Sequence, residues 1–346
     1  MKKNAHEILK GDRTRHLKIF LVLFFSLLLT AILSLYIGRY RDNSGQTLKL
    51  LFSKLLPLKK TWEDTFETVI FKIRLPRIIA AIMVGGSLSV AGTAYQSVFK
   101  NPLVSPDILG ASSGAAFGAA LSIYLDLNAT LVQTISFCFS IGAVFFAYMI
   151  GKKIKRDATL SLILAGILVG SLNSALVSLL KFTADPNNKL PAITFWLLGS
   201  LSTIKMGDLK YIWIPMLIGL VPLLFLRWKI NVLSIGDTDA KALGINLKMV
   251  RAEVIFCATL LTAAAVSVSG LVGWVGLVVP NLCRQITGSD NRILIPSSAM
   301  LGAIFLLVVD NVARSLCLLE IPLGVLTAIL GAPFFAVLAI SRGEKL

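Results

Sequence analysis

Long apolar blocks with charges at their ends dominate the sequence, and they constrain its fold more than any other feature. Most of them approach the about 20 apolar residues that one membrane-spanning helix needs. A helix also satisfies every backbone hydrogen bond of such a block inside lipid. The sequence therefore predicts an all-α, polytopic membrane protein with about ten transmembrane helices, at residues 19–38, 77–99, 107–124, 131–151, 159–180, 209–228, 252–269, 274–285, 293–313 and 322–340.

The composition agrees with this prediction and argues against a soluble enzyme. Of the 346 residues, 56% are apolar and 15% are charged, and the mean hydropathy is +0.81. Soluble domains average about 45–50% apolar and about 25% charged residues. Because ten spans with short connections use most of the chain, no room remains for a soluble catalytic domain.

The formal net charge of +16 could suggest a nucleic-acid partner. The basic residues lie at the ends of apolar blocks, however, so they indicate topology, and no nucleic acid is expected. The basic tail of residues 1–18 predicts a cytoplasmic N-terminus. Ten spans over residues 19–341 then place the tail of residues 342–346 in the cytoplasm as well.

The connections between spans contain further predicted elements. Residues 39–73 predict one or two short helices on the outer surface, and residues 192–201 predict another within an outer loop. In the third span, Gly110, Gly114 and Gly118 recur at every fourth position. Such small residues allow neighbouring helices to approach closely, so they predict tight packing of this span.

Residues 229–251 form the longest cytoplasmic connection and contain two helical patterns, at 234–243 and from 247 onward, separated by Gly244. Asp237 and Asp239 stand at the start of the first pattern, where acidic groups stabilise a helix N-terminus. A helix–glycine–helix segment that neither spans the membrane nor simply turns predicts a docking site for a partner.

No motif for bond chemistry occurs in the chain. The sequence lacks a Walker A pattern, HExxH, GxSxG and an acidic EF-hand loop. We therefore expect no catalytic residue, no cofactor and no metal site, and any ATP hydrolysis must come from a partner subunit.

Ionisable residues within the spans are few, and Asp310 is the clearest. Intramembrane carboxylates often mark proton or ion paths. Since Arg314 follows at i+4, a salt bridge between the two is the favoured interpretation. Arg74 and Arg77 flank Pro76 at the start of the second span, where they predict either lipid anchoring or a basic patch for an acidic partner.

Five blocks of the sequence resemble the FecCD-type permease family of bacterial ABC importers for iron-siderophores, haem and cobalamin. The blocks are RLPRIIAAIMVGGSLSVAGTAYQSVFKNPLVSPDILGASSGAAFG (74–118), FWLLGSL (195–201), GDTDAKALGIN (236–246), GLVGWVGLVVPNLCR (270–284) and IPLGVLTAILGAPFF (321–335). The resemblance runs in order from about residue 19 to the C-terminus. It implies a ten-span subunit that pairs with a second permease chain, identical or paralogous.

The resemblance also implies partners and roles for particular residues. An extracytoplasmic substrate-binding (lipo)protein would dock on Arg74, Arg77 and Arg314. Two cytoplasmic ATP-binding subunits would dock on coupling helices within residues 234–251, with roles for Ser234, Gly236, Asp237, Asp239, Ala242, Leu243, Gly244 and Asn246. A cytoplasmic gate would comprise Asn101, Leu103, Thr159 and Leu160, although the cobalamin-importer relative has a small polar residue in place of Leu160. The fifth and tenth spans would line the pore and contact the second chain.

These expectations predict a permease in the lipid of the bacterial cytoplasmic membrane that imports a ferric siderophore or similar iron chelate by alternating access. Haem or cobalamin import is the alternative within the family. An ion-coupled secondary transporter is the alternative from another class, which paired intramembrane carboxylates and inverted repeats would favour. A structural membrane scaffold is a weaker third alternative.

Overall fold

The computed structural model describes residues 2–38, 46–53, 60, 62–154, 158–235, 240, 242–317 and 319–343, and every regular element in these ranges is a helix. This confirms the predicted all-helical class. The elements are α1 (Lys2–Tyr36), α2 (Gln46–Ser53), α3 (Asp64–Thr68), the π-helical η1 (Val69–Arg74), α4 (Leu75–Val98), the 3₁₀ turn η2 (Pro106–Leu109), α5 (Ala111–Tyr124), α6 (Ala129–Lys153), α7 (Ala158–Thr183), α8 (Lys189–Leu198), α9 (Met206–Ile235), α11 (Leu247–Ser269), α12 (Val275–Thr287), α13 (Asn291–Ser315) and α14 (Leu323–Gly343).

A helix occupies the place of each predicted span. Seven of the described helical stretches are long and apolar enough to cross a membrane. The others, α5, α12 and the apolar part of α14, are shorter than that criterion requires. The count of ten spans and the cytoplasmic side of both termini therefore stay predictions.

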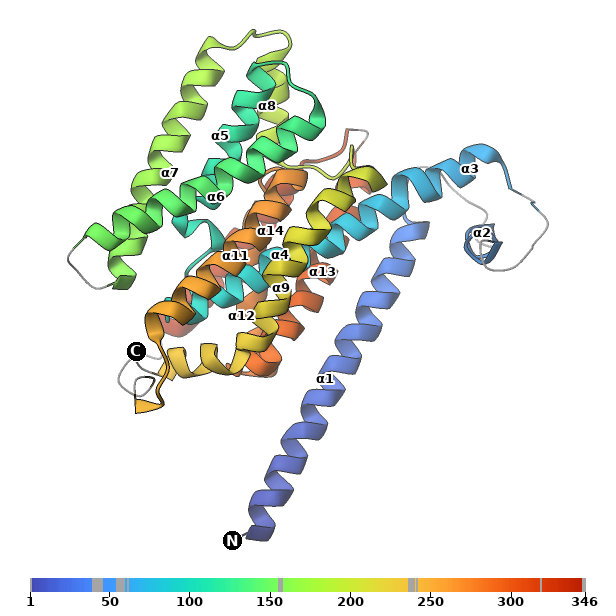
Figure 1. Ribbon diagram of the computed structural model, residues 1–346. Helices are drawn as coiled ribbons and strands as arrows, with labels where there is room; N and C mark the ends of the chain where they lie inside the picture. Colours follow the sequence, from blue (N-terminus) through green and yellow to red (C-terminus); the bar gives the residue numbers. More distant parts are fainter. Residues whose placement is uncertain are drawn as a thin grey trace.

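Helices α4 and α11 form the centre of the bundle, whereas α1 lies at its edge (Figure 1). Within their apolar windows, 78% of the α4 stretch and 83% of α11 are buried, against 17% of α1. Glycines bring α4 into backbone contact with its neighbours. A Cβ added to Gly85 would lie 2.3 Å from the carbonyl oxygen of Gly302 on α13, and one added to Gly92 would lie 1.8 Å from that of Gly276 on α12.

Helices α5, α6, α7 and α8 gather at one side of this centre (Figure 1). A Cβ added to Gly114 would lie 2.6 Å from the carbonyl oxygen of Phe139, so α5 and α6 are also in close contact. The hydroxyl of Ser136 donates to the Ala115 carbonyl across this contact at 3.0 Å. The predicted tight packing of the glycine-rich span is therefore confirmed.

Large apolar side chains remain exposed on the outer faces of several helices. Phe25 on α1, Phe146 on α6 and Phe225 on α9 are examples, with Phe225 83% exposed. Such faces are typical of helices surrounded by lipid or by a second membrane chain.

The second predicted span begins earlier than residue 77. The helix runs without a break from α3 through the wide turns of η1 into α4. Pro76 lies in the first turn of α4, as expected, and has no N–H to donate to the turn before it. The wide turns of η1 therefore come just before Pro76, which cannot donate the backbone hydrogen bond of a regular α-helical turn.

Candidate functional site

Arg77, on α4, is buried between two carboxylates from distant parts of the chain. Its Nε donates to Oδ1 and Oδ2 of Asp310 on α13 at 2.8 and 2.9 Å. Its Nη1 donates to Oε1 and Oε2 of Glu320, in the connection between α13 and α14, at 2.9 and 2.8 Å. The guanidinium is 5% exposed, so these charge-assisted bonds replace the water that burial removes.

Two further arginines hold the end of α1 against this site. Arg74 Nη1 donates to the carbonyl of Leu35, and Arg314 Nη2 donates to that of Ser34. Asn311 Nδ2 donates to the Ser34 hydroxyl at 2.7 Å. Because α1 ends at Tyr36, the two carbonyls belong to its last turn, where acceptors lack helical partners and the dipole favours cations.

We call Arg74, Arg77, Arg314, Asp310 and Glu320 the arginine cluster. The favoured pairing of Asp310 with Arg314 is only a 4.0 Å contact, since the closer partner of Asp310 is Arg77. The pattern within one helix could not reveal this, because Arg77 lies on another helix. Glu320 was not identified from the sequence either, because its partner Arg77 lies on a distant helix.

The three arginines predicted to dock a partner do lie together, but all are buried, with Arg74 3%, Arg77 4% and Arg314 6% exposed. A basic patch for a partner would therefore be made of buried side chains. The carbonyls and carboxylates that the guanidinium groups contact explain the burial. Anchoring in lipid headgroups does not fit these contacts, and docking stays a prediction.

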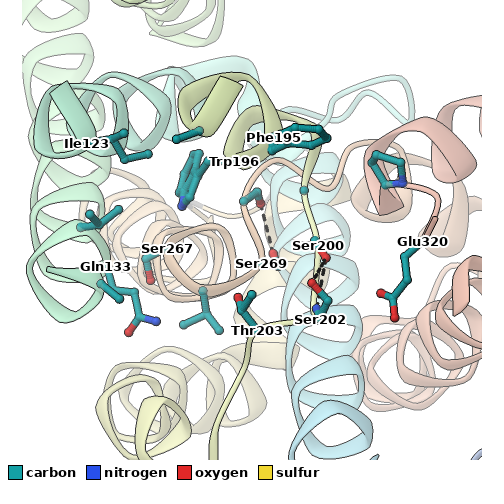
Figure 2. Close-up of a pocket in the computed structure, with 17 residues that line it drawn as sticks. Ile123, Gln133, Phe195, Trp196, Ser200, Ser202, Thr203, Ser267, Ser269 and Glu320 are labelled. Atoms are coloured by element: carbon teal, nitrogen blue, oxygen red, sulfur yellow. Dashed lines mark hydrogen bonds between the residues drawn. The ribbon is translucent and has the colours of Figure 1, made fainter. Parts of the chain in front are cut away.

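Beside the cluster is a cavity of about 470 Å³ that we call the outer cavity, since it lies on the predicted external side. Figure 2 shows Glu320 at one side of it and Gln133, from α6, at the other. Oε1 of Gln133 is buried and has no hydrogen-bond partner within the described ranges. Aromatic and hydroxyl side chains complete the lining, including Phe195, Trp196, Ser200, Ser202, Thr203, Ser267 and Ser269. Sequence reasoning identified none of these as site residues.

The coupling segment, residues 234–251, is described in part. Gly236, Asp237 and Asp239 lie outside the described residues. Ser234 is in the last turn of α9 and its hydroxyl donates to the Ile230 carbonyl at 3.0 Å. Ala242 and Leu243 are exposed, Leu243 to 59%.

Gly244 has a φ of +72°, a left-handed conformation that favours glycine. The second helical pattern is not a separate piece, however. Residues 247–251 are the first turn of α11, which continues into the membrane. Oδ1 of Asn246 accepts from Met249 N at 3.2 Å and so caps the N-terminus of that helix. No glycine or proline interrupts the helix between this cap and Ser269.

The predicted gate residues lie at the ends of different helices. Oδ1 of Asn101 accepts from Leu103 N at 2.9 Å, which shapes the turn after α4, and Leu103 is 51% exposed. Thr159 and Leu160 are in the first turn of α7, with Leu160 43% exposed. Their joint action as a gate stays a prediction.

A chain of hydrogen bonds joins the end of α9 to the helix that carries the Asn101 turn. Asn231 donates to Asp290 Oδ1 at 2.5 Å and accepts from Asn291 N at 2.7 Å. Asn291 Oδ1 in turn accepts from the Ser97 hydroxyl on α4 at 2.9 Å. These bonds therefore join the helix that leads into the coupling segment to the helix that leads into the Asn101 turn, through residues that sequence reasoning did not identify.

The model of the FecCD transport family matches residues 26–341. The chain belongs to this family. The molybdate import system permease protein MolB of Haemophilus influenzae is 41% identical over 93% of this chain and 95% of its own length. An iron chelatin transport system permease protein of Helicobacter pylori is 41% identical over 79% of this chain and 82% of its own. A solved metal-chelate type ABC transporter in an inward-facing conformation is 39% identical, with a TM-score of 0.84 over 94% of this chain and 99% of that one.

As a member of the FecCD transport family, the chain is an ABC transporter permease subunit and a multi-pass protein of the cytoplasmic membrane. The ion-coupled secondary transporter and the structural scaffold, both left open by the sequence, are therefore set aside.

Proposed function

We propose that the chain imports a ferric siderophore or similar iron chelate by alternating access. It would act as one of two permease chains, identical or paralogous, with two cytoplasmic ATP-binding subunits and an extracytoplasmic substrate-binding protein. ATP-driven closure of the ATP-binding subunits would press on the coupling segment and open one gate as the other closes.

The hydrogen bonds from Asn231 through Asp290 and Asn291 to Ser97 are the main support for this mechanism. Importers need a rigid link between the site where force arrives and the gate that must move. The hydrogen bonds of 2.5 to 2.9 Å join α9, which leads into the coupling segment, to α4, which leads into the Asn101 turn. A displacement of the coupling segment would therefore reach the turn through bonded groups.

Iron chelate as the cargo is supported by the Helicobacter pylori relative and by the metal-chelate type transporter. Molybdate is a second candidate, since MolB matches a larger share of this chain at the same identity. Haem or cobalamin remains the alternative carried over from the family resemblance.

Uptake in cells tests the proposal. The chain is co-expressed with the ATP-binding subunits and substrate-binding protein of its own organism in a strain that lacks iron-chelate and molybdate importers. ⁵⁵Fe-siderophore uptake is expected, and it should vanish when the ATP-binding subunits carry an inactivated Walker A lysine. Uptake of ⁹⁹Mo-molybdate but not of the ⁵⁵Fe-chelate would show that the cargo is molybdate, the second candidate, and not an iron chelate. Uptake that survives the inactive ATP-binding subunits would overturn the ATP-driven mechanism.

A further inference from the structure

Of the two carboxylates that bind Arg77, only that of Glu320 is exposed enough for a carboxylate of another molecule to replace it. The side chain of Asp310 is 1% exposed, whereas that of Glu320 is 34% exposed. Glu320 is therefore the partner of Arg77 that another molecule can reach, whereas Asp310 is closed off. Removal of Glu320 would leave Nη1 of Arg77 open while Nε stays bonded to Asp310.

One donor of the arginine cluster also lacks an acceptor within the described part of the chain. Nε of Arg314 has no hydrogen-bond partner among the residues that the structure describes, and the nearest carboxylate oxygen, of Asp310, is 4.0 Å away. Buried donors are normally paired, so the cluster has the chemistry to accept a further carboxylate.

Glu320 links this cluster to the outer cavity, because it lines the cavity and stands just before α14. Two residues that follow it are held by backbone hydrogen bonds. Ile321 N donates to the Ala313 carbonyl at 3.2 Å, and Leu323 N donates to the Gly199 carbonyl at 2.9 Å. A displacement of Glu320 would therefore act on the start of α14 and on the loop after α8.

We propose that Glu320 occupies the place on Arg77 that a carboxylate of the docked binding protein takes, so that docking displaces Glu320 and frees the connection between α13 and α14 beside the outer cavity. This inference rests on the proposed function, because it needs an extracytoplasmic binding protein. The bond from Arg77 to Glu320 would then be the resting state of the external surface, and the bond to the partner the docked state.

Glu320→Gln tests the competition. The amide keeps the shape of the side chain but loses the charge that competes for Arg77. In the complex with the ATP-binding subunits, the binding protein of the uptake assay should dock about tenfold more tightly than on the wild type, as expected for removal of a close competing charge. Glu67→Gln is the matched control: it removes a carboxylate that contacts Lys60 at 3.4 Å. It should change the affinity far less.

A spin label at Leu319, which is 85% exposed, reports the connection itself. Its mobility should rise when the binding protein docks on the wild type, and it should already be high in Glu320→Gln without the binding protein. Equal docking by Glu320→Gln and Glu67→Gln, or an immobile label in both states, would overturn the inference while leaving the proposed function intact. A wild-type complex that binds no binding protein would overturn both.

Discussion

Nε of Arg77 lies 2.8 Å from Oδ1 of Asp310, although 233 residues separate them in the sequence. The contact forms because Gly85 and Gly302 let α4 and α13 pack backbone against backbone. It places an ion pair between two central helices. Glu320 then binds the remaining side of the Arg77 guanidinium.

Asp310→Asn should destabilise the protein by about 3 kcal/mol, since it breaks a buried ion pair and leaves Arg77 with Glu320 alone. Thermal melting of the purified complex measures the effect. The control Asp126→Asn breaks an ion pair with Lys189 in which Asp126 is 74% exposed, so it should cost less than about 1 kcal/mol. The double variant Arg77→Gln with Asp310→Asn should cost less than the sum of the single changes. Equal melting temperatures for Asp310→Asn and Asp126→Asn would contradict this account.

Gly244→Val should prevent assembly with the ATP-binding subunits or uncouple their hydrolysis from uptake. No atom of the described residues lies within 4 Å of a Cβ added at this position, so the strain expected within the chain comes from the φ of +72°. Gly207→Val adds the same side chain where space is also open and φ is ordinary, and it should leave coupling unchanged. Gly244→Asn should be mild, because Asn tolerates the left-handed conformation. Co-purification and uptake per ATP hydrolysed are the measurements, and a normal ratio for Gly244→Val would refute the role of this turn.

Asn231→Ala should lower uptake per ATP hydrolysed several-fold, because it removes the bonds to both Asp290 and Asn291. ATP hydrolysis itself should continue, since the ATP-binding subunits still dock. Asn187→Ala, in the predicted outer loop, is the control for the loss of an asparagine side chain and should transport normally. If Asn231→Ala keeps the wild-type ratio of uptake to hydrolysis, force does not travel along this connection.

Gly92→Ala should strongly reduce the amount of folded protein, because the new Cβ would lie 1.8 Å from the Gly276 carbonyl oxygen and one helix would have to move. Gly142→Ala introduces the same methyl group on α6, where no atom of the described residues would lie within 4 Å of it. It should be neutral or stabilising by up to about 1 kcal/mol, because alanine favours the helix. Detergent-extracted yield and melting temperature compare the two, and similar values would contradict the close approach of α4 and α12.

The sequence allowed prediction of features that depend on neighbouring residues. Apolar length located the helices, the apolar centre of an outer loop predicted α8, and the break at Gly244 matched its positive φ. Contacts between distant helices could not be predicted, because apolar periodicity does not specify which helix faces which. The partners of Arg77 and the bonds of Asn231 belong to this class.

Knowledge of these partners changes how docking should be tested. Replacement of Arg77 by Glu would place a third carboxylate next to Asp310 and Glu320 inside the bundle, so it would disturb folding as well as docking. A change at Glu320 avoids this, because its side chain is partly exposed and Arg77 keeps Asp310.

The backbone contacts of α4 with α12 and α13 limit where the permease can hinge. Where carbonyl oxygens meet glycine Cα atoms, no layer of side chains exists that could change rotamers and let the helices slide. We therefore expect α4, α12 and α13 to travel as a single rigid body during the transport cycle. The hinges would then lie at its borders, in the connections that lead to α5, to α11 and to α14.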